Sequence, residues 1–248
     1  MPQNPRAPAS QTKFFSKAGT PGNWGTGAPS GIKLIIFDLD GTLMDAYLPV
    51  WQSVNFAMAQ MGFPPQTHET IKRSVGWGEE HLIRSFVGEE ALQKTLKIYR
   101  RHHALALPRA VKLLPGAKNV LKFLKGRGYQ LAVASNRSRR FSLIAMQALH
   151  MDHFINFLIC RDEVKRGKPY PDMFRRILKQ FSLRSNQALY VGDMTIDIEA
   201  GRRAGIRTVV VLTGSSLRRE MQALNPAKII RRLSQLPAVI EKFDTSGH

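Results

Sequence analysis

The chain has a single cysteine, Cys160, among its 248 residues. One cysteine cannot form an intrachain disulfide, and it cannot supply the several thiolates that a zinc or iron–sulfur site of the cysteine type requires. Cys160 stands at the end of a short apolar run, so we interpret it as a small buried residue. The cysteine content therefore favours a reducing compartment.

Long apolar runs are absent as well. No stretch approaches the roughly 20 apolar residues of a membrane-spanning helix, and the N-terminus lacks the apolar segment of a secretory signal peptide. We therefore expect a soluble, cytoplasmic protein without a membrane partner. The alternative is organellar import directed by the N-terminal residues, which contain no acidic side chain.

Acidic residues are scarce: 18 Asp and Glu stand against 37 Lys and Arg, which gives a net charge of +19. This balance points to an anionic partner, whether nucleic acid, an anionic membrane surface or an anionic substrate. A hydrophobic fraction of 43% is sufficient for a packed core. The composition therefore excludes disorder of the whole chain but leaves the partner open.

Residues 1–31 differ in composition from the rest of the chain. They are rich in Pro, Gly, Ser, Thr, Asn and Gln, and their only charged side chains are basic. A segment of this kind cannot bury enough apolar surface to fold, so we predict a disordered basic tail.

After this tail, strand and helix patterns alternate, except in the helical block 47–109. We predict strands at 33–37, 130–134, 154–159, 188–191, 208–212 and 228–230, and helices at 115–126, 138–149, 171–181 and 195–204. The alternation indicates an α/β fold, a doubly wound parallel sheet. The block 47–109 follows the first strand and would be an inserted all-helical cap domain, leaving residues 32–46 and 110–248 as the core domain.

Polar side chains stand where the predicted strands end. Ligands bind at the carboxyl ends of the strands in doubly wound sheets, so we expect these side chains to converge at one edge. They are Asp38, Asp40, Ser135, Asn136, Lys168, Asp193 and Asp197.

This set of side chains suits one kind of chemistry. Oxygen ligands without His or Cys favour Mg²⁺. Two carboxylates at i and i+2 of an extended segment point the same way, so one can attack phosphorus while the other moves a proton. A lysine and a hydroxyl can hold the remaining phosphoryl oxygens. The pattern therefore predicts Mg²⁺-dependent phosphoryl transfer.

Four segments in this order resemble the motifs of the haloacid dehalogenase superfamily. They are FDLDGTLMD at 37–45, VASN at 133–136, GKPYPD at 167–172 and VGDMTID at 191–197. The helical block between the first two is similar to the cap of the phosphoglycolate phosphatase-like branch, and the resemblance covers roughly residues 32–243. It implies a Rossmann-like core and a phosphatase that acts on a small anionic phosphorylated metabolite.

The resemblance also implies individual roles. Asp38 would be the nucleophile, and Asp40 the general acid and then the general base. Mg²⁺ would be bound by Asp38, the Asp40 carbonyl oxygen and Asp193, with Asp197 in a supporting position. Ser135, the Asn136 backbone and Lys168 would bind the phosphoryl group.

Two further segments acquire a role from the resemblance. Gly41 and Thr42 would begin a short flap that lets the cap open and close. A cap loop that contains Gly76 and Trp77 would lie near the substrate.

Simpler structural roles are alternatives for several of these residues. Asp38 and Asp40 would then be turn residues, and Ser135–Asn136 and Asp193 would cap the helices that follow them. Trp77 would pack in the cap. The pair His102–His103 is interpreted as solvated side chains of a helix.

The substrate and the reaction also have alternatives. Phosphoglycolate is the first substrate that the branch resemblance suggests. A pyrophosphatase, or a phosphotransferase or mutase similar to β-phosphoglucomutase, would use the same aspartyl-phosphate. From another class, a basic nucleic-acid-associated binding protein would account for the charge. Arginines recur in pairs, such as Arg100–Arg101 and Arg139–Arg140, but no RNA-recognition aromatic motif accompanies them.

Overall fold

The computed structural model describes residues 31–245. The tail predicted for residues 1–31 therefore lies outside the described residues, apart from Gly31. None of the described helices is long and apolar enough to cross a membrane.

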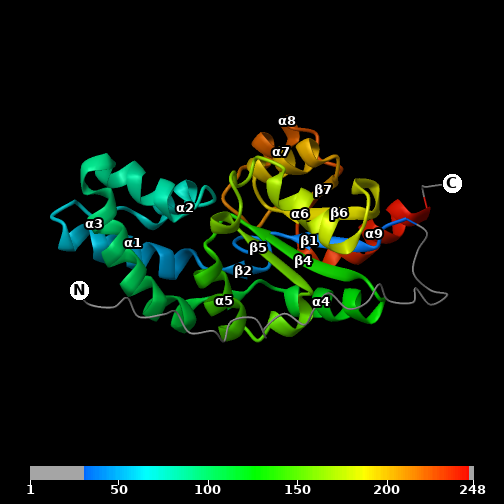
Figure 1. Ribbon diagram of the computed structural model, residues 1–248, viewed down its shortest axis with the longest axis horizontal. Helices are drawn as coiled ribbons and strands as arrows, with labels where there is room; N and C mark the ends of the chain where they lie inside the picture. The colour runs from blue at the N-terminus through cyan, green and yellow to red at the C-terminus, as the bar shows by residue number, and fades with distance from the viewer. Residues whose placement is uncertain (1–30, 246–248) are drawn as a thin grey trace, which may run out of the picture.

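The centre of the molecule is a six-stranded parallel sheet with the order β5-β4-β1-β6-β7-β8 (Figure 1). Its strands are β1 (Leu34–Phe37), β4 (Gln130–Ser135), β5 (Phe157–Cys160), β6 (Ala188–Gly192), β7 (Arg207–Val211) and β8 (Lys228–Ile230). All pairs are parallel. The predicted doubly wound parallel sheet is confirmed.

Helices cover both faces of the sheet because side chains alternate along each strand. Ile35 and Phe37 of β1 pack on one face, whereas Leu34 and Ile36 pack on the other. The first face is covered by α4 (Ala117–Gly126), α5 (Arg139–Ala148) and α9 (Leu236–Thr245), and the second by α6 (Asp172–Phe181) and α7 (Thr195–Ala204). α8 (Arg218–Ala223) packs beside α7.

One predicted strand boundary is wrong. The strand expected from residue 154 begins at Phe157, and Asp152–Phe154 form a 3-10 turn instead. Asn156 makes the first contacts with β4, since its N–H donates to the Leu131 carbonyl and its Oδ1 accepts from the Leu131 N–H. Phe154 and Ile155 are apolar like the strand itself, so the pattern does not mark this start.

A helical insertion follows β1, and it forms the left-hand part of the molecule in Figure 1. It consists of α1 (Tyr47–Gln60), α2 (His68–Ser74) and α3 (Glu79–Ala110). The chain enters it through β2 (Met44–Asp45) and leaves it through β3 (Lys112–Leu113), which pair as an antiparallel ribbon. The sequence does not predict this ribbon, which is the junction between insertion and sheet.

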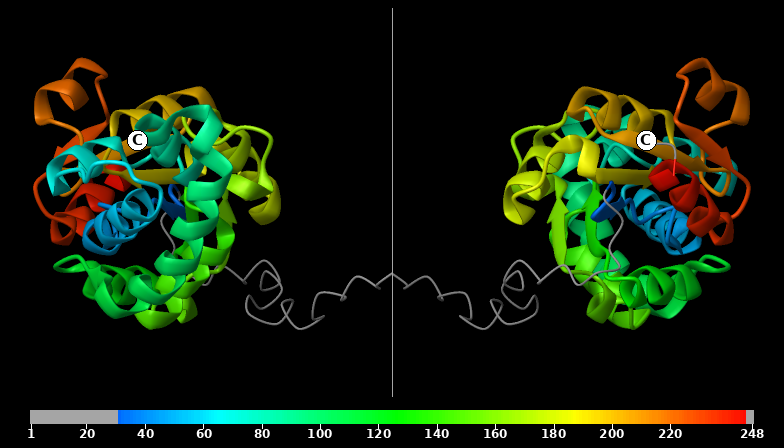
Figure 2. Two further views of the ribbon diagram at one scale, coloured as in Figure 1. Left: turned by 90° about the vertical axis from the view of Figure 1, so that its left-hand side faces the viewer. Right: turned by 90° about the vertical axis from the view of Figure 1, so that its right-hand side faces the viewer.

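The interpretation of His102–His103 as a solvated pair is wrong for His103, which is fully buried. Tyr99, His103 and Leu107 recur every four residues on α3, so they form one inward face of the helix. α3 packs with this face against α1 and α5 (Figure 2). Only His102, one position along, is partly exposed.

Candidate active site

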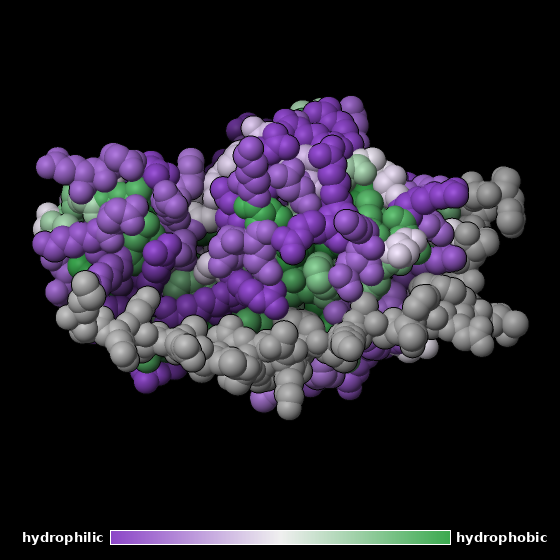
Figure 3. All heavy atoms as spheres, in the orientation of Figure 1, coloured by the Kyte–Doolittle hydropathy of each residue, from purple (hydrophilic) through white to green (hydrophobic). Residues whose placement is uncertain are grey.

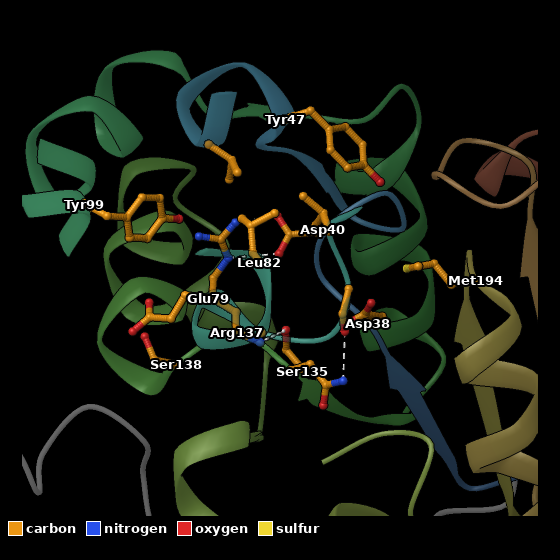
Figure 4. A pocket seen from close by; sticks show the side chains of 15 residues that line it. Asp38, Asp40, Tyr47, Glu79, Leu82, Tyr99, Ser135, Arg137, Ser138 and Met194 are labelled. Carbon is orange, nitrogen blue, oxygen red and sulfur yellow. Dashed lines mark hydrogen bonds and ion pairs between the residues drawn. The ribbon is translucent and has the colours of Figure 1, made fainter. Parts of the chain in front are cut away.

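The polar side chains that follow the strands meet at the carboxyl edge of β4, β1 and β6, which are neighbours in the sheet. A cavity of about 50 Å³ lies there, between the sheet and the insertion. Its lining includes Asp38, Asp40, Ser135, Asn136 and Arg137 (Figure 4).

Lys168 is the cation at the base of this site, and its side chain is 1% exposed. Its Nζ lies 2.8 Å from Asp38 Oδ1 and 2.9 Å from Asp197 Oδ1, and it donates to the Tyr190 hydroxyl at 3.0 Å. Burial raises the pKa of Asp38 to about 6, and the ammonium of Lys168 opposes that rise. The carboxylates hold the pKa of Lys168 above its usual range, against the effect of burial, so this lysine stays charged.

Asp193 follows β6 and is fully buried. The Thr42 hydroxyl donates to its Oδ1 at 2.8 Å, whereas its Oδ2 has no hydrogen-bond partner within the described residues. Burial and then the charges of Asp197 and Asp38 raise the pKa of Asp193 well above its usual range. A carboxylate oxygen that is buried and unpaired is a strong signal of a cation site.

Asp197 uses both of its oxygens within the protein. Oδ2 accepts from the backbone N–H groups of Asp193 and Met194, and Oδ1 accepts from the Tyr190 hydroxyl at 2.7 Å. Asp197 thus satisfies the first turn of α7, and the interpretation of Asp193 as the cap of that helix is wrong because the N-cap is Met194. These bonds support a positioning role for Asp197.

The side chains present fit a Mg²⁺ ion. Asp38, Asp193 and Asp197 each place a carboxylate oxygen so that these atoms lie within 4.8 Å of one another. Since Asp197 is committed to backbone and tyrosine donors, Asp38 and Asp193 are the side chains with oxygens to offer. Two carboxylates with the remaining positions filled by water, a carbonyl oxygen or phosphate are typical of Mg²⁺.

Asn136 joins three segments through its side chain. Its Nδ2 donates to the Gly76 carbonyl of the insertion at 2.8 Å and to the Lys168 carbonyl at 3.0 Å, and its Oδ1 accepts from the Lys168 N–H at 2.8 Å. Ser135 and Asn136 do not cap α5, because its N-cap is Ser138, so that interpretation is wrong. Ser135, Asn136 and Arg137 of this loop instead line the cavity.

Residues of the cap loop line two neighbouring cavities. Gly76 lines the inner cavity, Trp77 lines an adjoining outer cavity of about 560 Å³ and is 44% exposed, and Gly78 lines both. Trp77 lies near His81, with 5.8 Å between the ring centroids. The outer cavity also contains Arg140 on the sheet side.

Asp40 is paired with a residue that the sequence analysis did not single out. Arg137 donates from Nε to Asp40 Oδ2 at 2.9 Å and from Nη2 to Asp40 Oδ1 at 2.7 Å. Its Nη1 lies 2.9 Å from Nε2 of His103 on α3. Figure 4 shows the guanidinium beside the Asp40 carboxylate.

A family model described as haloacid dehalogenase-like hydrolase matches residues 35–211. The chain belongs to this family. A phosphoglycolate phosphatase of Pseudomonas savastanoi pv. phaseolicola is 30% identical over 213 residues, which are 82% of this chain and 78% of that protein. A phosphoglycolate phosphatase of Nitrosospira multiformis is 27% identical over 222 residues, 86% of this chain and 98% of that protein.

A solved structure has the same fold. The crystal structure of a predicted phosphoglycolate phosphatase from Haemophilus somnus superposes with a TM-score of 0.77 at 25% identity. The match covers 84% of this chain and 98% of that one. In this haloacid dehalogenase-like hydrolase, the helical insertion lies between β1 and β4.

The sequence analysis did not single out Arg137, and it assigned His103 to a solvated helix face. Arg137 directly follows Ser135–Asn136, and an arginine next to a phosphate-binding loop is a usable signal. His103 carries a weaker signal, its place in the four-residue repeat with Tyr99. Their contact joins β4 to α3, and no sequence spacing encodes it.

Proposed function

We propose that the chain is a Mg²⁺-dependent phosphatase that hydrolyses a small phosphate monoester through an aspartyl-phosphate on Asp38. The observation that carries this proposal is the buried group of Asp38, Lys168 and Asp193, in which one oxygen of Asp193 has no partner among the described residues. Membership of a hydrolase family supports the reaction class.

Each side chain has a role in this proposal. Asp38 attacks phosphorus, and Lys168, the Ser135 hydroxyl and the Asn136 backbone hold the phosphoryl oxygens. Asp40 gives a proton to the leaving oxygen and later accepts one from the attacking water. Asp38, Asp193 and the Asp40 carbonyl would hold Mg²⁺, which when bound neutralises charge on the phosphoryl oxygens.

The two cavities bear on the size of the substrate. A volume of about 50 Å³ corresponds to a few water molecules and suits a phosphoryl group. A leaving group larger than that extends toward the outer cavity of about 560 Å³. Phosphoglycolate heads the list of substrates to test because the curated relatives carry that name; sugar phosphates, nucleotides and pyrophosphate complete it.

The test compares wild type with Asp38→Asn on 4-nitrophenyl phosphate with Mg²⁺. We expect the variant to lose at least about 10³-fold in kcat, because the amide cannot form the phosphoenzyme. Asp152→Asn is the matched control, since this carboxylate lies in the turn before β5 at the opposite edge of the sheet. Equal activity of wild type and Asp38→Asn would overturn the proposal.

The same preparation separates the hydrolase from a mutase. Incubation with hexose phosphates should release inorganic phosphate. Isomerisation of the sugar phosphate without phosphate release would instead support the phosphotransferase alternative.

A further inference from the structure

Arg137 connects the Asp40 carboxylate to His103 on α3. It holds both carboxylate oxygens of Asp40 with two nitrogens and reaches the imidazole with the third. Its side chain is 8% exposed, that of Asp40 is 15% exposed, and His103 is buried. A guanidinium shielded in this way is fixed by its partners rather than by solvent.

The hydrogen-bond directions define the state of His103. A guanidinium can only donate, so the Nε2 atom of His103 accepts from Arg137 and carries no proton. Nδ1 lies 3.1 Å from Ser53 Oγ, and the Ser53 hydroxyl donates to the Pro49 carbonyl at 2.7 Å. His103 Nδ1–H therefore donates to Ser53, which anchors the imidazole to α1.

The electrostatics agree with a neutral ring. Burial and then the charge of Arg137 lower the pKa of His103 to about 2. The imidazole therefore does not repel the guanidinium, and it offers a lone pair at the position that Arg137 needs.

The contact with Arg137 leaves acceptor positions free on the Asp40 carboxylate. An ionised carboxylate has about four acceptor positions, and Arg137 occupies one on each oxygen. Each oxygen therefore keeps a further acceptor position, so that Asp40 can take a proton from water while Arg137 holds the carboxylate in place. This arrangement suits the second half of the reaction, in which Asp40 takes a proton from water.

We propose that His103 is a positioning residue that, through Arg137, fixes the Asp40 carboxylate as the base that hydrolyses the aspartyl-phosphate. The inference rests on the proposed phosphatase function. In this step the water oxygen bonds to phosphorus while its proton passes to Asp40. The bond between phosphorus and the Asp38 oxygen breaks, its electron pair returns to Asp38, and inorganic phosphate leaves.

The structure thereby links this base to the helical insertion. Ser53 belongs to α1 and His103 to α3, whereas Arg137 and Asp40 belong to the loops after β4 and β1. The full set of contacts exists only when the insertion lies over the sheet as it does here. Water activation then depends on the position of the insertion.

The test uses 4-nitrophenyl phosphate, whose leaving group departs without a proton, so that Asp40 is needed only in the second step. His103→Leu removes the acceptor and keeps an apolar side chain against Tyr99 and Phe141. His103→Gln keeps an acceptor oxygen near the Nε2 position. His102→Leu is the matched control, because His102 contacts Ser53 and Phe56 but not Arg137.

We expect kcat and KM of His103→Leu to fall together by about tenfold, since a general base contributes about 10²–10⁴-fold and is here loosened rather than removed. kcat/KM should stay within about twofold of wild type, because it reports only the first step. Rapid mixing should show a burst of nitrophenolate as phosphoenzyme accumulates. His103→Gln should restore most of kcat, and His102→Leu should resemble wild type.

A fall in kcat/KM without a burst, unchanged kinetics, or a Gln variant as slow as the Leu variant would each overturn the inference. Melting curves of all variants serve to check that each retains the native state. Failure of the proposed function would look different. Wild type would then hydrolyse no 4-nitrophenyl phosphate, or Asp38→Asn would be as active as wild type, and neither result involves a His103 variant.

Discussion

Asp193 is the residue at which burial and charge conflict most. It is fully buried, it repels Asp38 and Asp197, and only one of its oxygens is hydrogen-bonded within the described residues. Among the described residues, Lys168 is the one cation that pairs with the carboxylates of this cluster, through Asp38 and Asp197, so three carboxylates face one ammonium. An ionised Asp193 therefore destabilises the metal-free fold, and a divalent cation would reverse that effect.

The variant Asp193→Asn tests this balance. Without Mg²⁺, we expect its free energy of unfolding to exceed that of wild type, since the amide removes the repulsion that Asp193 experiences from Asp38 and Asp197. Saturating Mg²⁺ should stabilise wild type by about 2.7 kcal/mol at 100 times Kd. Mg²⁺ should leave the free energy of unfolding of Asp193→Asn unchanged. Urea unfolding with EDTA or Mg²⁺ measures both quantities, and a Mg²⁺ effect that survives in the variant would contradict this assignment.

The turn after β1 contains Gly41, which lets the loop that carries Asp38 approach Asp193 closely. Gly41 has a φ of +78°, in the left-handed region that glycine adopts without strain. A Cβ at this position would overlap the Asp193 carboxylate and would lie 2.7 Å from the Tyr47 hydroxyl oxygen. The turn therefore requires glycine both for its conformation and for the close approach of β6.

Gly41→Ala should lower kcat/KM by at least about 100-fold, because displacement of Asp193 misplaces both the metal ligand and the nucleophile. It should also lose about 1–3 kcal/mol of stability through backbone strain. Gly62→Ala is the matched control: its φ is +75°, and nothing lies within 4 Å of the added methyl group. Equal losses of activity in the two variants, measured with 4-nitrophenyl phosphate, would show that strain alone is responsible.

The elements also explain which parts of the site the sequence could predict. Asp38 and Asp193 were predictable because each ends a short apolar strand, and parallel strands bring their ends together. The contact of Arg137 with His103 could not be predicted from the sequence, because it depends on how α3 lies over the loop after β4. Trp77 was ambiguous for the same reason. The loop places Gly76 at the inner cavity and the Trp77 indole at the outer one.

Charge is distributed unevenly over the whole molecule. The net charge is +19, yet several of the few carboxylates are buried together at the carboxyl edge of the sheet. Hydrophilic side chains cover most of the face seen in Figure 3, and apolar patches interrupt them over both the insertion and the sheet. A surface of this sign attracts anionic substrates, and the effect is strongest where the cations line the entrance.

Charge reversal at two places separates local attraction from overall charge. Arg140 lines the outer cavity and stacks on Phe141, with 5.6 Å to the ring, whereas Arg127 stacks on Phe123 at 5.1 Å just before β4, at the opposite edge. Each substitution by Glu changes the net charge equally. We expect Arg140→Glu to lower kcat/KM for a dianionic phosphate ester about three- to tenfold at low salt, through KM, while Arg127→Glu has little effect. The difference should shrink at about 0.5 M NaCl, where the Debye length is only a few ångströms. Equal effects of the two variants would instead assign the attraction to the charge of the whole molecule.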